Sequence, residues 1–154
     1  MDTRKLVAEW IIRTARGAAW APILVFLLHL VLSRLVGAHV AFSPLDLPMH
    51  LLGGVAITYF AAYAAGTALG LGLLGRPTRA LLVFVVFTAA CSAAMFWEFA
   101  EFCSDYLLGT HAQVDLEDTL SDMFFGVVGS IVYLSAVRFR VIARDVGSWT
   151  AADS

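Results

Sequence analysis

Acidic residues recur at helical spacing in three separate parts of the chain. Two triplets stand at positions i, i+3 and i+7, so each shares one face of a helix: Glu98, Glu101 and Asp105, and then Asp115, Asp118 and Asp122. Asp46 and His50 stand at i and i+4. Carboxylates with an imidazole are common ligands of divalent metals and common general acids and bases. If the three stripes meet, the spacing indicates metal-binding or proton-transfer chemistry.

The composition indicates which solvent surrounds these residues. The chain has 154 residues, of which 60% are hydrophobic and only 14% charged, and its mean hydropathy is +0.83. A soluble domain carries about 25% charged residues. Lipid is therefore the expected solvent, and the length suits a single helical bundle. Because the sequence has no basic patch with interleaved aromatic residues, we expect no nucleic-acid partner.

Four apolar segments can each supply the roughly 20 residues that a membrane-spanning helix needs. They cover about 18–37, 48–75, 80–104 and 116–137. The expected fold is all-α, a four-transmembrane-helix bundle over residues 18–138, followed by a cytoplasmic C-terminal tail at 139–154. Residues 1–17 place Leu6 and Trp10 beside basic residues, which favours either a short interfacial helix or a frayed tail. Small residues, including Gly66 and Gly70 in a G-x-x-x-G pattern and Gly126 with Gly129, would let helices approach closely.

The basic residues predict an orientation for this bundle. In an up-and-down topology nine of the ten basic residues fall on one side: Arg4, Lys5, Arg13, Arg16, Arg76, Arg79, Arg138, Arg140 and Arg144. Only Arg34 lies near the other side. By the positive-inside rule, the N and C termini are both cytoplasmic.

Most of the acids then gather near the outer face, together with His39, His50 and His111. They are Asp46, Glu98, Glu101, Asp105, Asp115, Glu117, Asp118 and Asp122. The uninterrupted apolar stretch that follows Asp122 has 15 residues, Met123 to Val137, and spans only about 22 Å of the roughly 30 Å of hydrocarbon. Asp122 must therefore lie below the outer surface, as must Glu98, which sits about 10 Å deeper than Asp105 on a regular helix.

Carboxylates that converge in a bundle cannot all stay charged and unpaired, so protons or a cation must accompany them. Arg34 can balance only one of them. A divalent metal (Zn²⁺, Mg²⁺, Mn²⁺ or Fe²⁺) is the hypothesis that we carry forward. Its predicted ligands are His50, Glu98, Asp122, Asp46 and Asp105. Glu101 or Asp118 is the predicted general base, and Arg34 is the predicted contact for an anionic headgroup.

Some of these acids also suit purely structural roles. Ser43-Pro44-Leu45-Asp46 is typical of a capping box, so Asp46 could cap its helix. Negative charge in the first turn of the 116–137 helix suits the helix dipole, and the residues concerned are Asp115, Glu117 and Asp118. His29, in mid-helix, is more typical of a satisfied core histidine than of a ligand.

The motifs that carry these residues also resemble a known family. They are Asp46-Leu-Pro-Met-His50 with Gly53-Gly54, Trp97-Glu98-Phe-Ala-Glu101 with Asp105, and the run from Asp115 through Asp118 and Asp122 to Gly126. Over about residues 46–130 the sequence resembles the YjdF-type family of small bacterial inner-membrane proteins, and more distantly the VanZ-like family. The resemblance implies a multi-pass protein of the bacterial inner membrane, shorter than most members, with the cluster facing the periplasm or exterior.

Three functions fit this cluster. The first is a metal-dependent membrane hydrolase or transferase that acts on a lipid-linked or envelope substrate. The second is a cation- or proton-coupled transporter or sensor, for which a homodimer could complete a pathway. The third is a scaffold subunit that holds a structural cation. Membrane lipid is a partner in all three.

Overall fold

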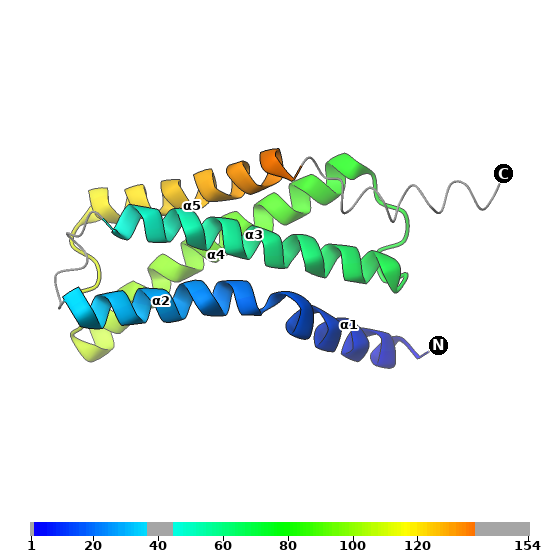
Figure 1. The fold of residues 1–154 in the computed structure, drawn as a ribbon, viewed down its shortest axis with the longest axis horizontal. Helices are drawn as coiled ribbons and strands as arrows, with labels where there is room; N and C mark the ends of the chain where they lie inside the picture. The colour runs from blue at the N-terminus through cyan, green and yellow to red at the C-terminus, as the bar shows by residue number, and fades with distance from the viewer. Residues whose placement is uncertain (1, 37–44, 138–154) are drawn as a thin grey trace.

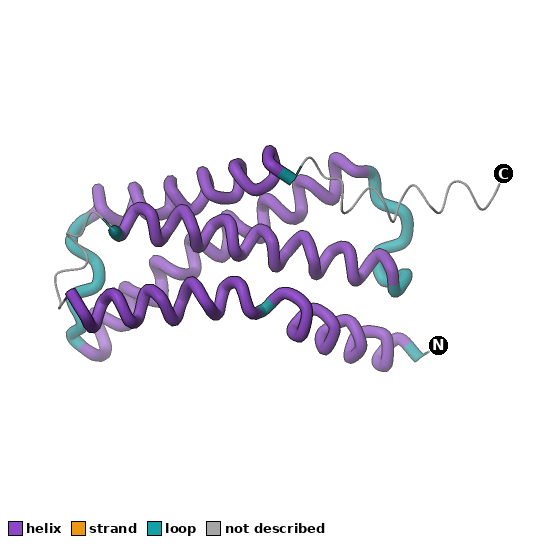
Figure 2. The backbone as a smooth tube through the Cα atoms, in the orientation of Figure 1, coloured by secondary structure: helices purple, strands orange, loops and turns teal. Residues whose placement is uncertain are grey.

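The computed structural model describes residues 2–36 and 45–137, with the side chains of 2–32 and 45–137. All regular structure in these ranges is α-helical (Figures 1 and 2). The helices are α1 (Thr3–Ala18), α2 (Trp20–Val36), α3 (Asp46–Gly70), α4 (Arg79–Leu108) and α5 (Leu116–Ala136). The predicted all-α class is confirmed, and every predicted apolar segment forms a helix.

The helix ends follow from local sequence. The Thr78 hydroxyl caps α4 by accepting a hydrogen bond from the Leu81 N–H, and the Asp115 carboxylate caps α5 by accepting one from the Asp118 N–H. Gly109 ends α4 in the left-handed region, with φ of 65°, where a side chain would be strained. Because α4 continues to Leu108, it is longer than the predicted segment and carries Asp105 on its last turns.

Helix α3 forms the centre of the bundle and contacts each of the other four helices. Its buried positions hold mostly small residues, which allow backbones to approach closely. A Cβ atom at Gly54 would overlap the carbonyl oxygen of Gly126, and one at Gly129 would overlap that of Leu51. We call this contact of α3 with α5 the glycine seam.

Helices α1 and α2 meet at a bend of 51° next to Ala19. Pro22 explains the break, because it has no N–H to donate to the carbonyl oxygen of Ala18, four residues earlier. The Trp10 indole N–H donates to the carbonyl oxygen of Ala64 at 2.8 Å, so α1 lies against the second half of α3. Residues 3–18 are helical as predicted, while a position at the membrane surface stays a prediction.

Within the described residues, three helices are long and apolar enough to cross a membrane: α3, α4 and α5. Counting the bent pair α1 and α2 as one span makes four. Figure 1 shows the N-terminus, the α3–α4 loop and the end of α5 at one end of the bundle. The end of α2, the start of α3, the end of α4 and the start of α5 lie at the other, which we call the acidic end. His39 and the predicted tail at 139–154 lie outside the described residues.

Candidate metal site

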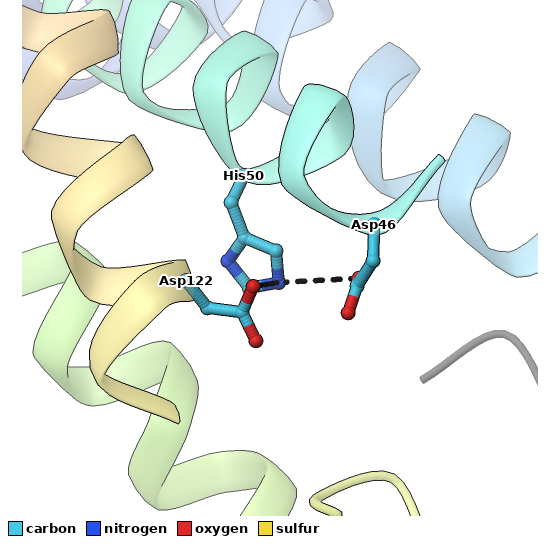
Figure 3. Close-up of side chains that lie close together, drawn as sticks. All are labelled: Asp46, His50 and Asp122. Atoms are coloured by element: carbon cyan, nitrogen blue, oxygen red, sulfur yellow. Dashed lines mark ion pairs between the residues drawn. The ribbon is translucent and has the colours of Figure 1, made fainter. Parts of the chain in front are cut away.

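The imidazole of His50 lies between two carboxylates at the acidic end (Figure 3). Its Nε2 atom is 3.5 Å from Oδ1 of Asp46, one helical turn earlier on α3. The same nitrogen is 3.7 Å from Oδ1 of Asp122 on α5. One ligand atom from each of the three residues lies within 4.8 Å of the other two, which is close enough for a single metal ion.

The other side of the imidazole faces α4. Oε1 of Glu98 lies 3.8 Å from His50 Nδ1. His50, Glu98 and Glu101 form a second group whose ligand atoms also lie within 4.8 Å of one another. The indole N–H of Trp97 donates to Oε1 of Glu101 at 2.7 Å, which fixes that carboxylate beside the histidine. His50 is therefore shared by two groups of carboxylates.

Two of the carboxylates are deeply buried and incompletely paired. The side chains of Glu98 and Asp122 are only 7% and 3% exposed. Oε1 of Glu98 and Oδ1 of Asp122 accept no hydrogen bond from any described residue. A buried acceptor without a partner loses its hydration and gains nothing in return. These are the two oxygens that face His50.

The glycine seam explains why Asp122 reaches the histidine. Gly126 follows Asp122 by one helical turn, and Gly54 follows His50 by one turn. Because both positions lack a side chain, the backbones of α3 and α5 touch there, and the polar side chains one turn earlier converge. The sequence motifs combine each ligand with the glycine that brings it into place.

Asp46 is not the N-cap residue of α3. The N-cap position of α3 is Leu45, with no side-chain cap hydrogen bond, and Asp46 is the first helical residue. Its side chain is buried and faces His50 (Figure 3). The Ser43 half of the proposed capping box lies outside the described residues.

The structure places Asp105 away from the cluster, although it was among the predicted ligands. Its carboxylate accepts hydrogen bonds from the Thr110 hydroxyl and from the N–H groups of Ala112 and Gln113, at 2.5, 2.6 and 2.9 Å. Asp105 belongs to neither group of potential ligands. It organises the connection between α4 and α5.

The remaining predicted residues have other surroundings. Oδ2 of Asp118 accepts a hydrogen bond from the Val114 N–H at 3.4 Å, and Asp118 also lies outside both ligand groups. Arg34 belongs to α2, but its side chain is outside the described part of the structure. His111 is exposed in the loop after α4. The ring centroid of His29 lies 5.7 Å from that of Trp97.

Residues 7–143 match the family described as "Predicted membrane protein (DUF2238)". The chain belongs to this family. No curated protein and no solved structure matches it.

Membership of DUF2238 confirms the membrane assignment that composition predicted, and the match includes the whole acidic end. The narrower resemblance to YjdF-type and VanZ-like proteins is not what the match shows. It stays a prediction.

Sequence reasoning on this DUF2238 chain missed one residue of the site. The Gln113 side-chain N–H donates to the main-chain oxygen of Glu98 at 3.0 Å and to its carboxylate at 3.3 Å. Gln113 lies in a loop, where no helical period relates it to α4, so no spacing signal could have found it. The role of Trp97 did have a signal, since Trp97 and Glu101 stand at i and i+4.

Proposed function

We propose that this chain is a metal-dependent membrane hydrolase or transferase acting on a lipid-linked or envelope substrate. The observation that carries the proposal is the pair of buried, unpartnered carboxylate oxygens, on Glu98 and Asp122, directed at the two nitrogens of His50. Natural proteins rarely retain such atoms without a bound partner.

The distances favour a cation between the groups over direct hydrogen bonds. An N–H···O hydrogen bond is about 2.7–3.2 Å long, whereas His50 Nε2 lies 3.5 and 3.7 Å from Asp46 and Asp122. Two ligand atoms bound tetrahedrally to one metal, with bonds of about 2.1 Å, would stand about 3.4 Å apart. The gaps around Nε2 match that separation.

We assign the metal ligands to His50 Nε2, Asp46 and Asp122. Three protein ligands with a fourth position for water or substrate are typical of catalytic zinc sites, although the oxygen ligands also suit Mn²⁺, Mg²⁺ or Fe²⁺. Oε1 of Glu98 lies 3.8 Å from His50 Nδ1, beyond hydrogen-bond length, and would accept a hydrogen bond from the Nδ1–H group once metal binding draws the side chains together. A carboxylate in that place is the usual arrangement for holding a metal-bound imidazole in one orientation. This makes Glu98 a positioning residue in the proposed mechanism.

Glu101 is the proposed general base. Its carboxylate lies beside His50 and Glu98 and is held by Trp97. A metal held by His50, Asp46 and Asp122 would supply Lewis acidity for attack on a phosphorus or acyl carbon. Glu101 would take the proton of the attacking water as its oxygen bonds to that atom, and would return the proton to the leaving oxygen as the bond to it breaks. An alcohol in place of water gives transfer instead of hydrolysis.

The same proposal includes an orientation and a location. The basic residues flanking the end opposite the cluster support cytoplasmic termini by the positive-inside rule. The acidic end then faces the periplasm or exterior. Arg34, in the last turn of α2, is the proposed contact for an anionic headgroup. The YjdF-type resemblance supports the bacterial inner membrane.

The described core supports this enzyme over a transporter. Transport needs polar groups that continue across the bundle. Among the described residues, the buried carboxylic acids, Asp46, Glu98 and Asp122, all lie at the acidic end. The buried polar side chains elsewhere are hydroxyls, on Thr14, Thr58 and Ser130.

Metal titration of the purified protein tests the proposal. After chelator treatment in detergent, Zn²⁺ or Mn²⁺ titrated by calorimetry should bind at one ion per chain, with the stoichiometry checked by element analysis. His50→Ala and Asp122→Asn should abolish this binding, while Glu98→Gln should weaken it about 10-fold. Asp105→Asn is the matched control, because Asp105 lies near the same end of α4 as Glu98 but outside the cluster. This variant should bind the metal as the original protein does. Binding that survives both His50→Ala and Asp122→Asn would contradict the proposal.

A further inference from the structure

An apolar cavity adjoins the candidate metal site. It has a volume of about 340 Å³ and lies between α2, α3 and α4, with Gly126 of α5 in its wall. Its lining is mostly hydrocarbon and aromatic, including Ile23, Phe26, Met49, Ile57, Ala93 and Trp97. His50 also lines it, so the cavity and the metal site share one side chain.

The lining excludes a cluster of water as the natural content. A buried water needs two to four polar partners. The side chains that bring polar groups to this wall are His29, His50 and Trp97, and the indole N–H of Trp97 already donates to Glu101. An apolar cavity among membrane-spanning helices is instead filled by what surrounds it, which is hydrocarbon chain.

The cavity has the size and the position to hold part of a lipid. Its volume falls at the lower end of the roughly 300–1,000 Å³ typical of small-molecule sites. Phe26 on α2 and Trp97 on α4 both line the cavity, and their ring centroids lie 5.8 Å apart in edge contact. A hydrocarbon chain in the cavity would extend along Ile57 and Met49 of α3 and end at His50.

We propose that this cavity binds the hydrocarbon chain of the substrate, and that the substrate is therefore an amphiphile whose head would meet the proposed metal at His50. This inference rests on the proposed function and names its substrate class. Because lipid gives no hydrophobic driving force, close packing in the cavity would hold the chain, the head would add to the affinity, and the cavity would set the position of the scissile bond.

The structure offers a matched pair of variants for testing the cavity. Gly53 and Gly66 both lie on α3, and an added Cβ atom at either would have no neighbour within 4 Å. Gly53 lines the cavity, whereas Gly66 lies outside it. Gly53→Leu should fill the cavity, and Gly66→Leu is the control with the same change on the same helix. Ala93→Leu fills the cavity from α4 if Gly53→Leu does not fold.

The probe is a lysophosphatidic acid whose single acyl chain carries bromine, which quenches tryptophan fluorescence on contact. Trp97 is read alone after Trp10, Trp20 and Trp149 are changed to Phe. In detergent with Zn²⁺ present, the full chain should show saturable quenching. Gly53→Leu should weaken binding at least 10-fold, and Gly66→Leu should not. Equal saturable quenching in Gly53→Leu and Ala93→Leu, or quenching that never saturates, would overturn the inference.

Two further arms separate this inference from the metal proposal. The Gly53→Leu variant should bind Zn²⁺ as the original chain does. A loss of lipid binding in this variant then concerns the cavity alone. A brominated long-chain alcohol without phosphate should bind more weakly than the phosphate probe, and His50→Ala should remove that difference while leaving saturable quenching. Saturable quenching without any Zn²⁺ binding would contradict the metal site and leave the chain-binding cavity standing.

Discussion

The two ends of the bundle bury different kinds of group. Away from the acidic end, Ala62, Ala65, Leu82 and Val86 form an apolar cluster packed against Tyr133 and other partly buried residues. At the acidic end, the buried side chains include three carboxylic acids, Asp46, Glu98 and Asp122. Unpartnered buried atoms elsewhere in the described chain are hydroxyls, on Thr14 and Ser130, whereas those at the acidic end are carboxylate oxygens.

This difference predicts that the two ends respond differently to added metal. Packed apolar side chains stabilise a bundle whatever the solution contains. Buried acids without partners destabilise it until a cation binds, because desolvation of charge exceeds what an incomplete set of contacts returns. The stability of the acidic end should therefore depend on metal, and that of the opposite end should not.

The largest loss of stability is expected at the glycine seam, because the packing at both ends of the bundle depends on this contact. Gly129→Ala places a Cβ atom against the carbonyl oxygen of Leu51, so α3 and α5 must separate. We expect the free energy of unfolding to fall by about 3 kcal/mol and metal binding to be lost with it. Thermal unfolding in detergent measures the first and zinc titration the second. Gly66→Ala, where a Cβ meets open space, should be neutral or stabilising. Equal stability of the two variants would refute the close contact.

A smaller loss should follow from a cavity in the apolar cluster. Leu82 is 3% exposed, and Leu82→Ala removes packing that the surrounding helices cannot fully replace. We expect a loss of about 2 kcal/mol, the same with and without Zn²⁺. Leu81, exposed on the same helix, is the control, and Leu81→Ala should change stability little. If the effect of Leu82→Ala depended on Zn²⁺, the separation of the two ends would be wrong.

At the acidic end, a substitution should raise the free energy of unfolding of the metal-free protein instead of lowering it. In metal-free protein at alkaline pH, where the acid is ionised, Asp122→Asn removes a buried charge while keeping the shape of the side chain, and should raise the free energy of unfolding by about 1 kcal/mol. In excess Zn²⁺ the original chain should be more stable than the Asp122→Asn variant. Only the original chain gains binding free energy, about 2.7 kcal/mol at a Zn²⁺ concentration of 100 times the dissociation constant. Unfolding temperatures with chelator and with Zn²⁺ measure both. A variant less stable than the original chain under chelator would indicate that Asp122 is already satisfied without a cation.

The sequence was sufficient for the helices and for the core of the cluster. Hydrophobicity predicted the spans because lipid requires long apolar helices, and the periods of three and four placed His50, Glu98 and Asp122 where helix ends meet. It could not separate Asp105 from that group. Asp105 shares the helical face of Glu98, but the loop after α4 folds back and donates its N–H groups to it. Loop geometry of this kind leaves no periodic signal.

The glycines also show what the sequence alone could not predict. The sequence marks both the Gly66–Gly70 pair and the Gly126–Gly129 pair as sites of close helix approach. In the structure a Cβ at Gly129 would overlap a neighbouring backbone, while one at Gly66 or Gly70 would meet nothing within 4 Å. Whether a glycine packs against a neighbouring helix depends on how α1, α3 and α5 are rotated about their own axes. The packing of the whole bundle sets that rotation.

The smallest expected effect concerns the loop that supports Glu98. Gln113→Ala removes the hydrogen bonds to the main-chain oxygen and carboxylate of Glu98, and we expect a loss of about 0.5–1 kcal/mol in unfolding free energy. Because Glu98 positions the imidazole instead of binding the metal in our assignment, zinc affinity should fall only a few fold, less than for Glu98→Gln. Calorimetry on the two single variants and the double variant measures this. If Glu98 were itself a ligand, Glu98→Gln would abolish binding as Asp122→Asn does, and the ligand set would shift toward the group of His50, Glu98 and Glu101.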